Sequence, residues 1–303
     1  MHPLIKDLIS HGPTITDGAW GTELQARGLG LGEFPDAWNL SRAAKVAEVA
    51  QAYIDAGSQI ILTNTFGANR IRLSADNLAE NLLEINWRGV EISRDAARNR
   101  ALVFASIGPS GKMLMNGDVT EDELSSAFAE QAEALAAAGA DALVVESMSD
   151  LEEARLAVVA ARATGRPVVA CMVFDCGKEK DRTMMGSTPE QTAEALAAAG
   201  ADVIGANCGQ GIAGFAAICR RLHAATNLPI WIKANAGLPR LVEGRAVYDT
   251  TPENFAEHIP ALLEAGASFI GGCCGTNPSF IRAIKQRIGT SAKKSVFSIL
   301  GET

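Results

Sequence analysis

A short phrase that recurs four times constrains what this chain can fold into. Ala-Gly, followed by one or two small or polar residues and an apolar run, occurs at Ala56-Gly57, Ala138-Gly139, Ala199-Gly200 and Ala265-Gly266. A glycine directly after a helix adopts positive φ without a Cβ penalty, so each copy predicts the end of a helix and the start of a strand. The copies lie roughly 60 to 80 residues apart, about twice the length of one βα unit, so we expect one further unit between successive copies.

This spacing predicts eight strands that alternate with helices. The strands are expected at residues 14–16, 59–63, 102–107, 142–145, 168–174, 203–206, 230–233 and 269–271. Ala- and Leu-rich stretches with helical periodicity lie between them, for example at residues 121–137, 149–163 and 189–199. Strands that are apolar on both faces and alternate with helices favour a closed parallel sheet, a single-domain α/β (β/α)8 barrel. The alternative is a doubly wound open sheet, but its usual glycine-rich nucleotide-binding motifs are absent from the sequence.

Length and composition agree with one enzyme-sized domain. The chain has 303 residues, of which 48% are hydrophobic, and we expect the barrel at residues 1–290 and a polar tail at residues 291–303. The net charge of −8 argues against nucleic acid as a partner. The sequence shows no targeting segment and no apolar run long enough to cross a membrane, so a cytoplasmic protein is expected. The sequence leaves the oligomeric state open.

Polar residues follow nearly every predicted strand. Active sites of (β/α)8 barrels lie at the carboxyl ends of the strands, so these residues are candidates for chemistry. Loops are polar in any case, and for a single Asp, Asn or Thr the two interpretations have similar weight. The candidates are Asp17, Thr63 to Thr65, Gly108 to Ser110, Glu146, Asp175, Asn207, Cys208, Asn235, Cys273 and Cys274.

Three cysteines at two strand ends are more specific. Cys208 ends the sixth strand, and Cys273 and Cys274 end the eighth, so their sulfurs can meet around one tetrahedral metal ion. Packing as small hydrophobic side chains and redox chemistry remain open alternatives. Zinc with three protein ligands keeps an exchangeable position, where a substrate thiol would bind as a thiolate and become a nucleophile. Cys171 and Cys219 are expected in the core.

Seven ordered motifs resemble the homocysteine S-methyltransferase family, which includes the homocysteine-binding module of cobalamin-dependent methionine synthase and the betaine-homocysteine methyltransferases. The resemblance runs nearly from end to end. The motifs are residues 16–24 (TDGAWGTEL), 62–68 (LTNTFGA), 107–111 (IGPSG), 145–150 (VESMSD), 206–209 (ANCG), 234–239 (ANAGLP) and 271–276 (GGCCGT).

The resemblance implies a Zn²⁺ ion on Cys208, Cys273 and Cys274, which makes these residues both metal ligands and catalytic. It implies that Asp17 and Glu146 receive the homocysteine ammonium and that Asn235 lies beside the zinc. Backbone donors near Gly18 and Thr65 are expected to hold the substrate carboxylate. The implied reaction is methyl transfer to zinc-bound homocysteine thiolate, which gives methionine.

The methyl donor is not determined by the sequence. It is expected to be a methylcorrinoid on a separate protein or a small onium compound such as betaine or S-methylmethionine. Trp20, Trp38 and Phe66 are the aromatic candidates for an onium site, and packing explains Trp38 equally well. Two other classes stay as alternatives: a barrel lyase or aldolase with Lys233 as a Schiff base, and a non-catalytic zinc-binding barrel.

Overall fold

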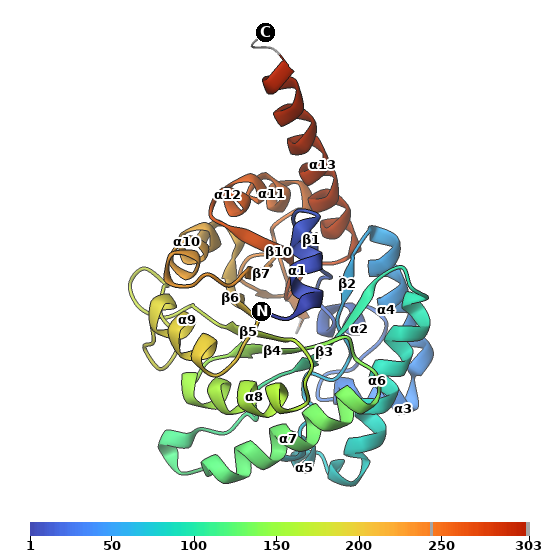
Figure 1. Ribbon diagram of the computed structural model, residues 1–303. Coiled ribbons are helices and arrows are strands. Elements are labelled where there is room, and N and C mark those ends of the chain that lie inside the picture. The colour runs from blue at the N-terminus through green and yellow to red at the C-terminus, as the bar shows by residue number, and fades with distance from the viewer. Residues whose placement is uncertain (243–244, 301–303) are drawn as a thin grey trace.

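A barrel of eight parallel strands, surrounded by helices, forms the body of the protein (Figure 1). The computed structural model describes residues 1–242 and 245–300. The strand order in the sheet is β1-β10-β7-β6-β5-β4-β3-β2. The strands are β1 (Thr14–Ile15), β2 (Ile60–Ile61), β3 (Leu102–Ile107), β4 (Ala142–Met148), β5 (Val168–Met172), β6 (Val203–Gly211), β7 (Ile230–Asn235) and β10 (Ala267–Gly272). The single-domain (β/α)8 prediction is therefore confirmed.

The seam between β1 and β2 closes the barrel with few bonds. The backbone N–H of Gln59 donates to the Ile15 carbonyl at 2.8 Å, and the Gln59 side chain accepts from the Ile15 N–H at 2.9 Å. Asp17 adds a third link, because its Oδ2 accepts from the Leu62 N–H at 2.7 Å. Asp17 is thus part of the structure that holds the first two strands together.

Helices on the outside follow the strands in turn. The outer layer contains α4 (Ala43–Ala56), α6 (Leu82–Ala97), α7 (Glu121–Ala137), α8 (Leu151–Ala163), α9 (Pro189–Ala198), α10 (Phe215–Ala225), α12 (Ile259–Glu264) and α13 (Pro278–Leu300). The glycines of the recurring phrase all have positive φ, between 94° and 108°, at Gly57, Gly139, Gly200 and Gly266. The mechanism inferred from the phrase is confirmed at each copy.

Shorter helices complete the connections at both ends of the barrel. They are α1 (Pro3–Ser10), α2 (Gly21–Ala26), α3 (Trp38–Ser41), α5 (Arg70–Ala75) and α11 (Pro252–Glu257). Helix α1 packs Ile5 against the apolar side chains inside the barrel. The described helices contain none that is long and apolar enough to cross a membrane.

The strand ends differ from the prediction in one instructive way. Strand β6 continues to Gly211, although the apolar pattern stops at residue 206. A register shift against β7 occurs between Asn207 and Gly211, so the extension is irregular. The extension was not predicted, because its residues are mostly polar or glycine and strands were predicted from runs of apolar residues.

Apolar side chains fill the half of the barrel interior nearer the amino-terminal ends of the strands, which we call the lower half. The half nearer the carboxyl ends is the upper half. Trp231 stacks on Phe104 with ring centroids 6.1 Å apart and lies 5.3 Å from Phe269. Gly205 on the neighbouring strand makes room for Trp231, because a Cβ there would lie 2.3 Å from the Trp231 carbonyl oxygen. Side chains alternate along a strand, so Lys233 faces the same interior one layer nearer the carboxyl ends.

A hairpin and the length of the last helix differ from the prediction. A hairpin of β8 (Arg240–Val242) and β9 (Arg245–Val247) follows β7, and α13 runs to Leu300 and projects from the body (Figure 1). The expected tail at residues 291–303 therefore begins within a helix, and residues 301–303 lie outside the described part.

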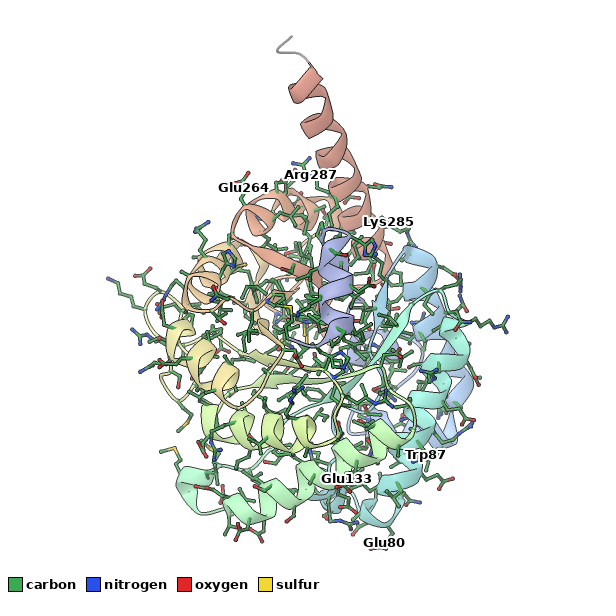
Figure 2. All side chains as sticks on the ribbon, viewed as in Figure 1. Glu80, Trp87, Glu133, Glu264, Lys285 and Arg287 are labelled. Atoms are coloured by element: carbon green, nitrogen blue, oxygen red, sulfur yellow. The ribbon has the colours of Figure 1, made fainter. Side chains whose placement is uncertain are left out.

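Charged side chains such as Glu80 and Glu264 lie at the periphery, on outer helical segments (Figure 2).

Candidate metal centre and substrate site

Three cysteine sulfurs meet at the carboxyl ends of β6 and β10. The Sγ atoms of Cys208, Cys273 and Cys274 all lie within 4.8 Å of one another, and all three residues are half-buried. The Cys208 and Cys274 sulfurs are 3.8 Å apart. A tetrahedral ion with metal–sulfur bonds of about 2.3 Å separates its sulfur ligands by about 3.8 Å, so this spacing fits zinc.

Backbone geometry on both strands brings the thiols together. Cys208 has a φ of 61°, a left-handed conformation that costs a non-glycine residue free energy and is retained mainly at functional sites. On β10, a Cβ at Gly271 would lie 2.0 Å from Thr16 Oγ1 and 2.4 Å from the Asp17 carbonyl oxygen. Glycine at position 271 therefore allows β10 to approach β1, and it positions the Cys273-Cys274 pair at the mouth.

The three thiols share negative charge unequally. Hydrogen bonds from Cys273 and Cys274, together with the Gly209 N–H, lower the pKa of Cys208 well below that of a free cysteine. The hydrogen bond to Cys208 and burial raise the pKa of Cys273, because a second thiolate so close to the first is unfavourable. The pKa of Cys274 is also raised, first by its hydrogen bond to Cys208. A bound divalent cation would offset this repulsion.

Two neighbours of the thiols fit a metal centre. The Asn235 side chain lies near enough to Cys208 to lower its pKa, and its Oδ1 has no hydrogen-bond partner although the residue is only 4% exposed. A buried amide oxygen without a partner is unusual and calls for an explanation, such as a bound ion or ligand. Tyr248 is the second neighbour; burial and then the nearby thiolates, Cys274 first, raise its pKa to about 12. The three clustered thiols, with these two neighbours, could hold a metal ion.

Glu146, at the end of β4, is the first carboxylate of the site. Its Oε1 accepts from the Ser106 hydroxyl at 2.5 Å, and its Oε2 lies 3.4 Å from the Asn207 Nδ2. Burial raises the pKa of Glu146, while the positive charge of Lys233 and the Ser106 hydrogen bond partly offset the rise. The two groups that donate to this carboxylate, the Ser106 hydroxyl and the Asn207 amide, are both neutral.

Asp17 is the second carboxylate and is fully buried. Its Oδ1 accepts from the Lys233 Nζ at 2.5 Å, and its Oδ2 accepts from the Trp20 Nε1 and the Leu62 N–H, both at 2.7 Å. Burial alone would lower the pKa of Lys233, but the charges of Asp17 and Glu146 outweigh it and raise this pKa above the ordinary value. Lys233 is thus held as an ammonium, which has no lone pair for a Schiff base.

The positions expected to hold the substrate carboxylate lie at the same end of the barrel. Thr65 is fully buried, and its hydroxyl hydrogen-bonds to the Ser106 carbonyl at 2.8 Å and to the Thr63 hydroxyl at 2.6 Å. Gly18 is packed closely, because a Cβ there would lie 2.7 Å from the Tyr53 hydroxyl oxygen. The Thr65 hydroxyl is committed to the protein, so only backbone groups remain for the role that the sequence predicts there.

Asn207 joins the acidic and thiol parts of the site, a role that the sequence did not reveal. Its Nδ2 donates to the Ser147 hydroxyl at 2.7 Å and lies 3.8 Å from the Cys273 sulfur. Its Oδ1 accepts from the Ser147 N–H at 2.8 Å, and Ser147 has a left-handed φ of 58°. Its place at a strand end was a visible signal, whereas Tyr248, far from any strand-end motif, carried none.

The other three cysteines and Trp38 are not part of the thiol cluster. Cys171 and Cys219 are buried in the apolar core, as expected. Cys176 is half-buried and hydrogen-bonds to Asp175 at 3.3 Å. Trp38 is 3% exposed; its indole N–H donates to Glu33 at 3.2 Å, and the Arg42 guanidinium lies 4.7 Å from its ring centroid. Trp38 is therefore packed, and its ring already contacts a cation of the chain.

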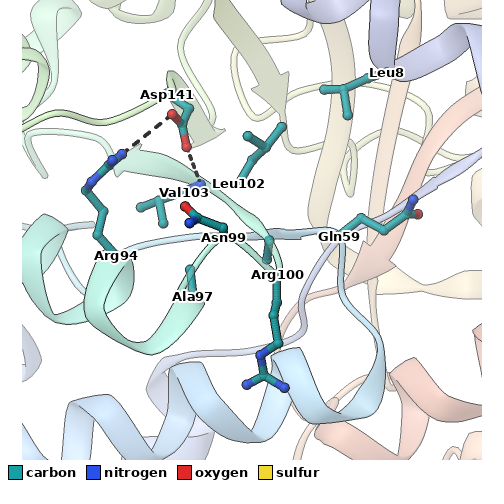
Figure 3. Close-up of a pocket in the computed structure, with 10 residues that line it drawn as sticks. Leu8, Gln59, Arg94, Ala97, Asn99, Arg100, Leu102, Val103 and Asp141 are labelled. Atoms are coloured by element: carbon teal, nitrogen blue, oxygen red, sulfur yellow. Dashed lines mark hydrogen bonds and ion pairs between the residues drawn. The ribbon is translucent and has the colours of Figure 1, made fainter.

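A surface pocket of about 420 Å³ lies at the opposite, amino-terminal side of the strands (Figure 3). Its cations are already paired: Arg94 lies 3.6 Å from Asp141, and Arg100 lies 2.9 Å from Asp55. The pocket offers no unpaired charge and no nucleophile from its lining. The chemistry-bearing residues converge at the carboxyl ends instead.

Known proteins are similar to this chain in sequence and in structure. The sequence model described as homocysteine S-methyltransferase matches residues 14–288. A methionine synthase of Mycobacterium tuberculosis is 31% identical over 299 residues, which cover 92% of this chain and 25% of that protein. The methionine synthase of Mycobacterium leprae is also 31% identical, over 89% of this chain and 24% of the relative. The chain thus spans about a quarter of the length of these two curated relatives.

A solved structure agrees over its whole length. The metallated form of the homocysteine methyltransferase MmuM from Escherichia coli superposes with a TM-score of 0.79 at 25% identity. The match covers 94% of this chain and 100% of that one.

Proposed function

Because the chain belongs to the homocysteine S-methyltransferase family, we propose that it transfers a methyl group to the thiol of homocysteine and forms methionine. The proposed cofactor is one Zn²⁺ ion held by Cys208, Cys273 and Cys274. The observation that carries this proposal is the meeting of three thiols, within 4.8 Å of one another, at the carboxyl end of the barrel. The similar MmuM structure is a metallated form, which supports the proposal that this chain also binds a metal.

Zinc, when bound there, would lower the pKa of a substrate thiol and keep it as a nucleophilic thiolate near neutral pH. The protein residues have the task of orienting the rest of the substrate. Glu146 offers a carboxylate to the substrate ammonium, and Ser106 and Asn207 hold that carboxylate in place. Asn235 lies beside Cys208 and contributes an unsatisfied oxygen. Backbone groups near Gly18 and Thr65 are the proposed donors for the substrate carboxylate.

The methyl donor belongs to one of two classes: a methylcorrinoid on a separate protein or a small onium compound. Packing of Trp38 removes one proposed aromatic wall for an onium donor. Phe66 remains, because it is 42% exposed and lies against Gly108 at the carboxyl end of β3. A donor site on this chain would therefore be built on Phe66 rather than on Trp38.

The proposed boundaries and location follow from the same features. We place the barrel at residues 1–290, which agrees with the family match ending at residue 288. All six cysteines are free, and three thiols that bind a metal require a reducing compartment, which favours the cytoplasm.

A donor screen tests the proposal. Zinc-loaded protein and homocysteine would be mixed separately with betaine, S-methylmethionine, S-adenosylmethionine, dimethylsulfoniopropionate or a methylcorrinoid protein, and methionine would be measured by mass spectrometry. We expect methionine from one donor class only, and loss of that product when zinc is removed. Metal binding without product from any donor would instead support a non-catalytic zinc-binding barrel. Borohydride trapping of a carbonyl substrate on Lys233 would support the lyase alternative.

A further inference from the structure

Three charged side chains lie buried together beneath the mouth of the barrel: Asp17, Glu146 and Lys233. Asp17 is fully buried, and Lys233 is only 2% exposed. The charges of both carboxylates act on the Lys233 ammonium, but Lys233 bonds to only one of them, Asp17. The two carboxylates of the proposed amine site are therefore not equivalent.

Donors from the protein already occupy Asp17. Lys233 bonds to one oxygen at 2.5 Å, and Trp20 and Leu62 bond to the other at 2.7 Å. A carboxylate has about four lone-pair sites, and here one cation and two N–H groups use three of them. The Leu62 bond also helps to close the β1–β2 seam, so moving Asp17 toward a ligand would disturb the barrel.

Glu146 is in the opposite situation. Its bonds come from a hydroxyl and, at 3.4 Å, from an amide, both of them neutral. Among the described residues no ion pair reaches Glu146 within 4 Å. Its hydrogen bond to Asn207 connects it to Cys273, so a cation bound at Glu146 would sit close to the thiol cluster.

We propose that Lys233 is a positioning and specificity residue: it neutralises Asp17, so that Glu146 alone receives the ammonium of the substrate. The inference rests on the proposed function. Two carboxylates and one internal ammonium leave one negative charge, which a single substrate ammonium balances. Without Lys233, the same site would hold two unpaired carboxylates facing one ammonium. The arrangement selects thiols that carry one amino group over otherwise similar thiols that carry none.

Binding of two thiols tests this division of roles. Cobalt-loaded protein would be titrated with homocysteine and with 4-mercaptobutanoate, which lacks the amino group, and the sulfur-to-cobalt charge-transfer absorption would report thiol binding. Glu146→Gln should weaken homocysteine binding by about tenfold or more and leave 4-mercaptobutanoate unchanged. The charge-neutral double variant Asp17→Asn/Lys233→Met should bind homocysteine within about threefold of the wild type, because Asp17 gives no net attraction to the ammonium.

A tenfold loss of homocysteine binding in the double variant, with 4-mercaptobutanoate binding intact, would overturn the inference and make Asp17 a direct ligand. Thermal unfolding and metal content would confirm that each variant is folded. If the double variant does not fold, Asp17→Asn/Lys233→Gln, whose amides can pair, takes its place. A folded wild type that responds to neither thiol would overturn the proposed function itself, which is a different outcome.

Discussion

The two halves of the barrel interior differ sharply, although the same strands line both. On β7, Trp231 packs among Phe104, Phe269 and other apolar side chains, whereas Lys233, two residues later, pairs with Asp17. The lower half stabilises the fold through close packing, which leaves little room for change. The upper half holds charges, unsatisfied oxygens and left-handed residues, which all cost stability. The difference supports the proposed site in the upper half.

Cysteines in the two halves differ in the same way, because their thiol pKa values are shifted in opposite directions. Cys171 lies in the lower half, where burial raises the pKa of its thiol well above that of a free cysteine. Cys208 lies in the upper half, where hydrogen bonds from two thiols lower its pKa. Only the second environment favours the thiolate that binds metals. Matched substitutions in the two halves therefore test whether only the upper half binds a metal and substrate.

The largest effect is expected from Cys273→Ser. Loss of one of three thiolates should lower zinc affinity by more than about 100-fold, because even changes outside the ligand shell cost that much. Methionine formation should be lost with the metal. Zinc content by metal analysis and turnover with homocysteine are the measurements.

Cys171→Ser is the matched control in the lower half. It should keep zinc and turnover and lose about 1 to 3 kcal/mol of stability, since a buried hydroxyl lacks a partner there. Zinc-dependent turnover that survives in Cys273→Ser would remove that residue from the ligand set.

Glu146→Ala separates substrate binding from metal binding within the upper half. The variant should bind zinc like the wild type, because the proposed metal ligands are the three clustered cysteines and Glu146 is not one of them. The KM for homocysteine should rise about 10- to 100-fold, as expected for a lost charged hydrogen bond. Steady-state kinetics together with zinc content check this. A fall in zinc content to that of Cys273→Ser would contradict the assignment.

The sequence was sufficient to predict the fold, and it identified the three cysteines that lie together in the structure. All eight strands were predicted, because buried parallel strands give apolar runs and the helices end at glycines such as Gly57 and Gly139. The three thiols were identified because strand ends converge in a barrel. Which buried side chains pair with one another could not be predicted from the sequence alone. That Lys233 pairs with Asp17 depends on the depth of each side chain, and apolar periodicity carries no information about it.

Gly205→Ala tests how tightly the lower half is packed. Its Cβ would lie 2.3 Å from the Trp231 carbonyl oxygen and 2.7 Å from Cys171 Sγ, so the backbone of β7 would have to move. We expect a loss of about 3 kcal/mol, the upper range for overpacking. Gly21→Ala is the control, because a Cβ there meets nothing within 4 Å. Thermal unfolding should show a lower midpoint for the first variant only; equal midpoints would mean that the interior adapts.

The smallest effect concerns Asp36, a buried acid near the mouth that, unlike Asp17, has no ion pair among the described residues. Burial raises its pKa from 3.8 to about 7, although the Gly67 N–H bonds to its Oδ1 at 3.0 Å. Between about pH 4 and pH 7 the unfolded chain is ionised while the folded protein keeps the proton, so the free energy of unfolding falls as pH rises.

Asp36→Asn removes this titration and keeps an acceptor for Gly67. The stability of the variant relative to the wild type should therefore increase by about 2 to 3 kcal/mol between pH 5 and pH 8 and level off at higher pH. Chemical denaturation at pH 5 and pH 8 measures the change. A relative stability that is the same at both values would mean that Asp36 is ionised in the folded protein. The upper half would then hold a second compensated carboxylate, and the contrast between Asp17 and Asp36 would disappear.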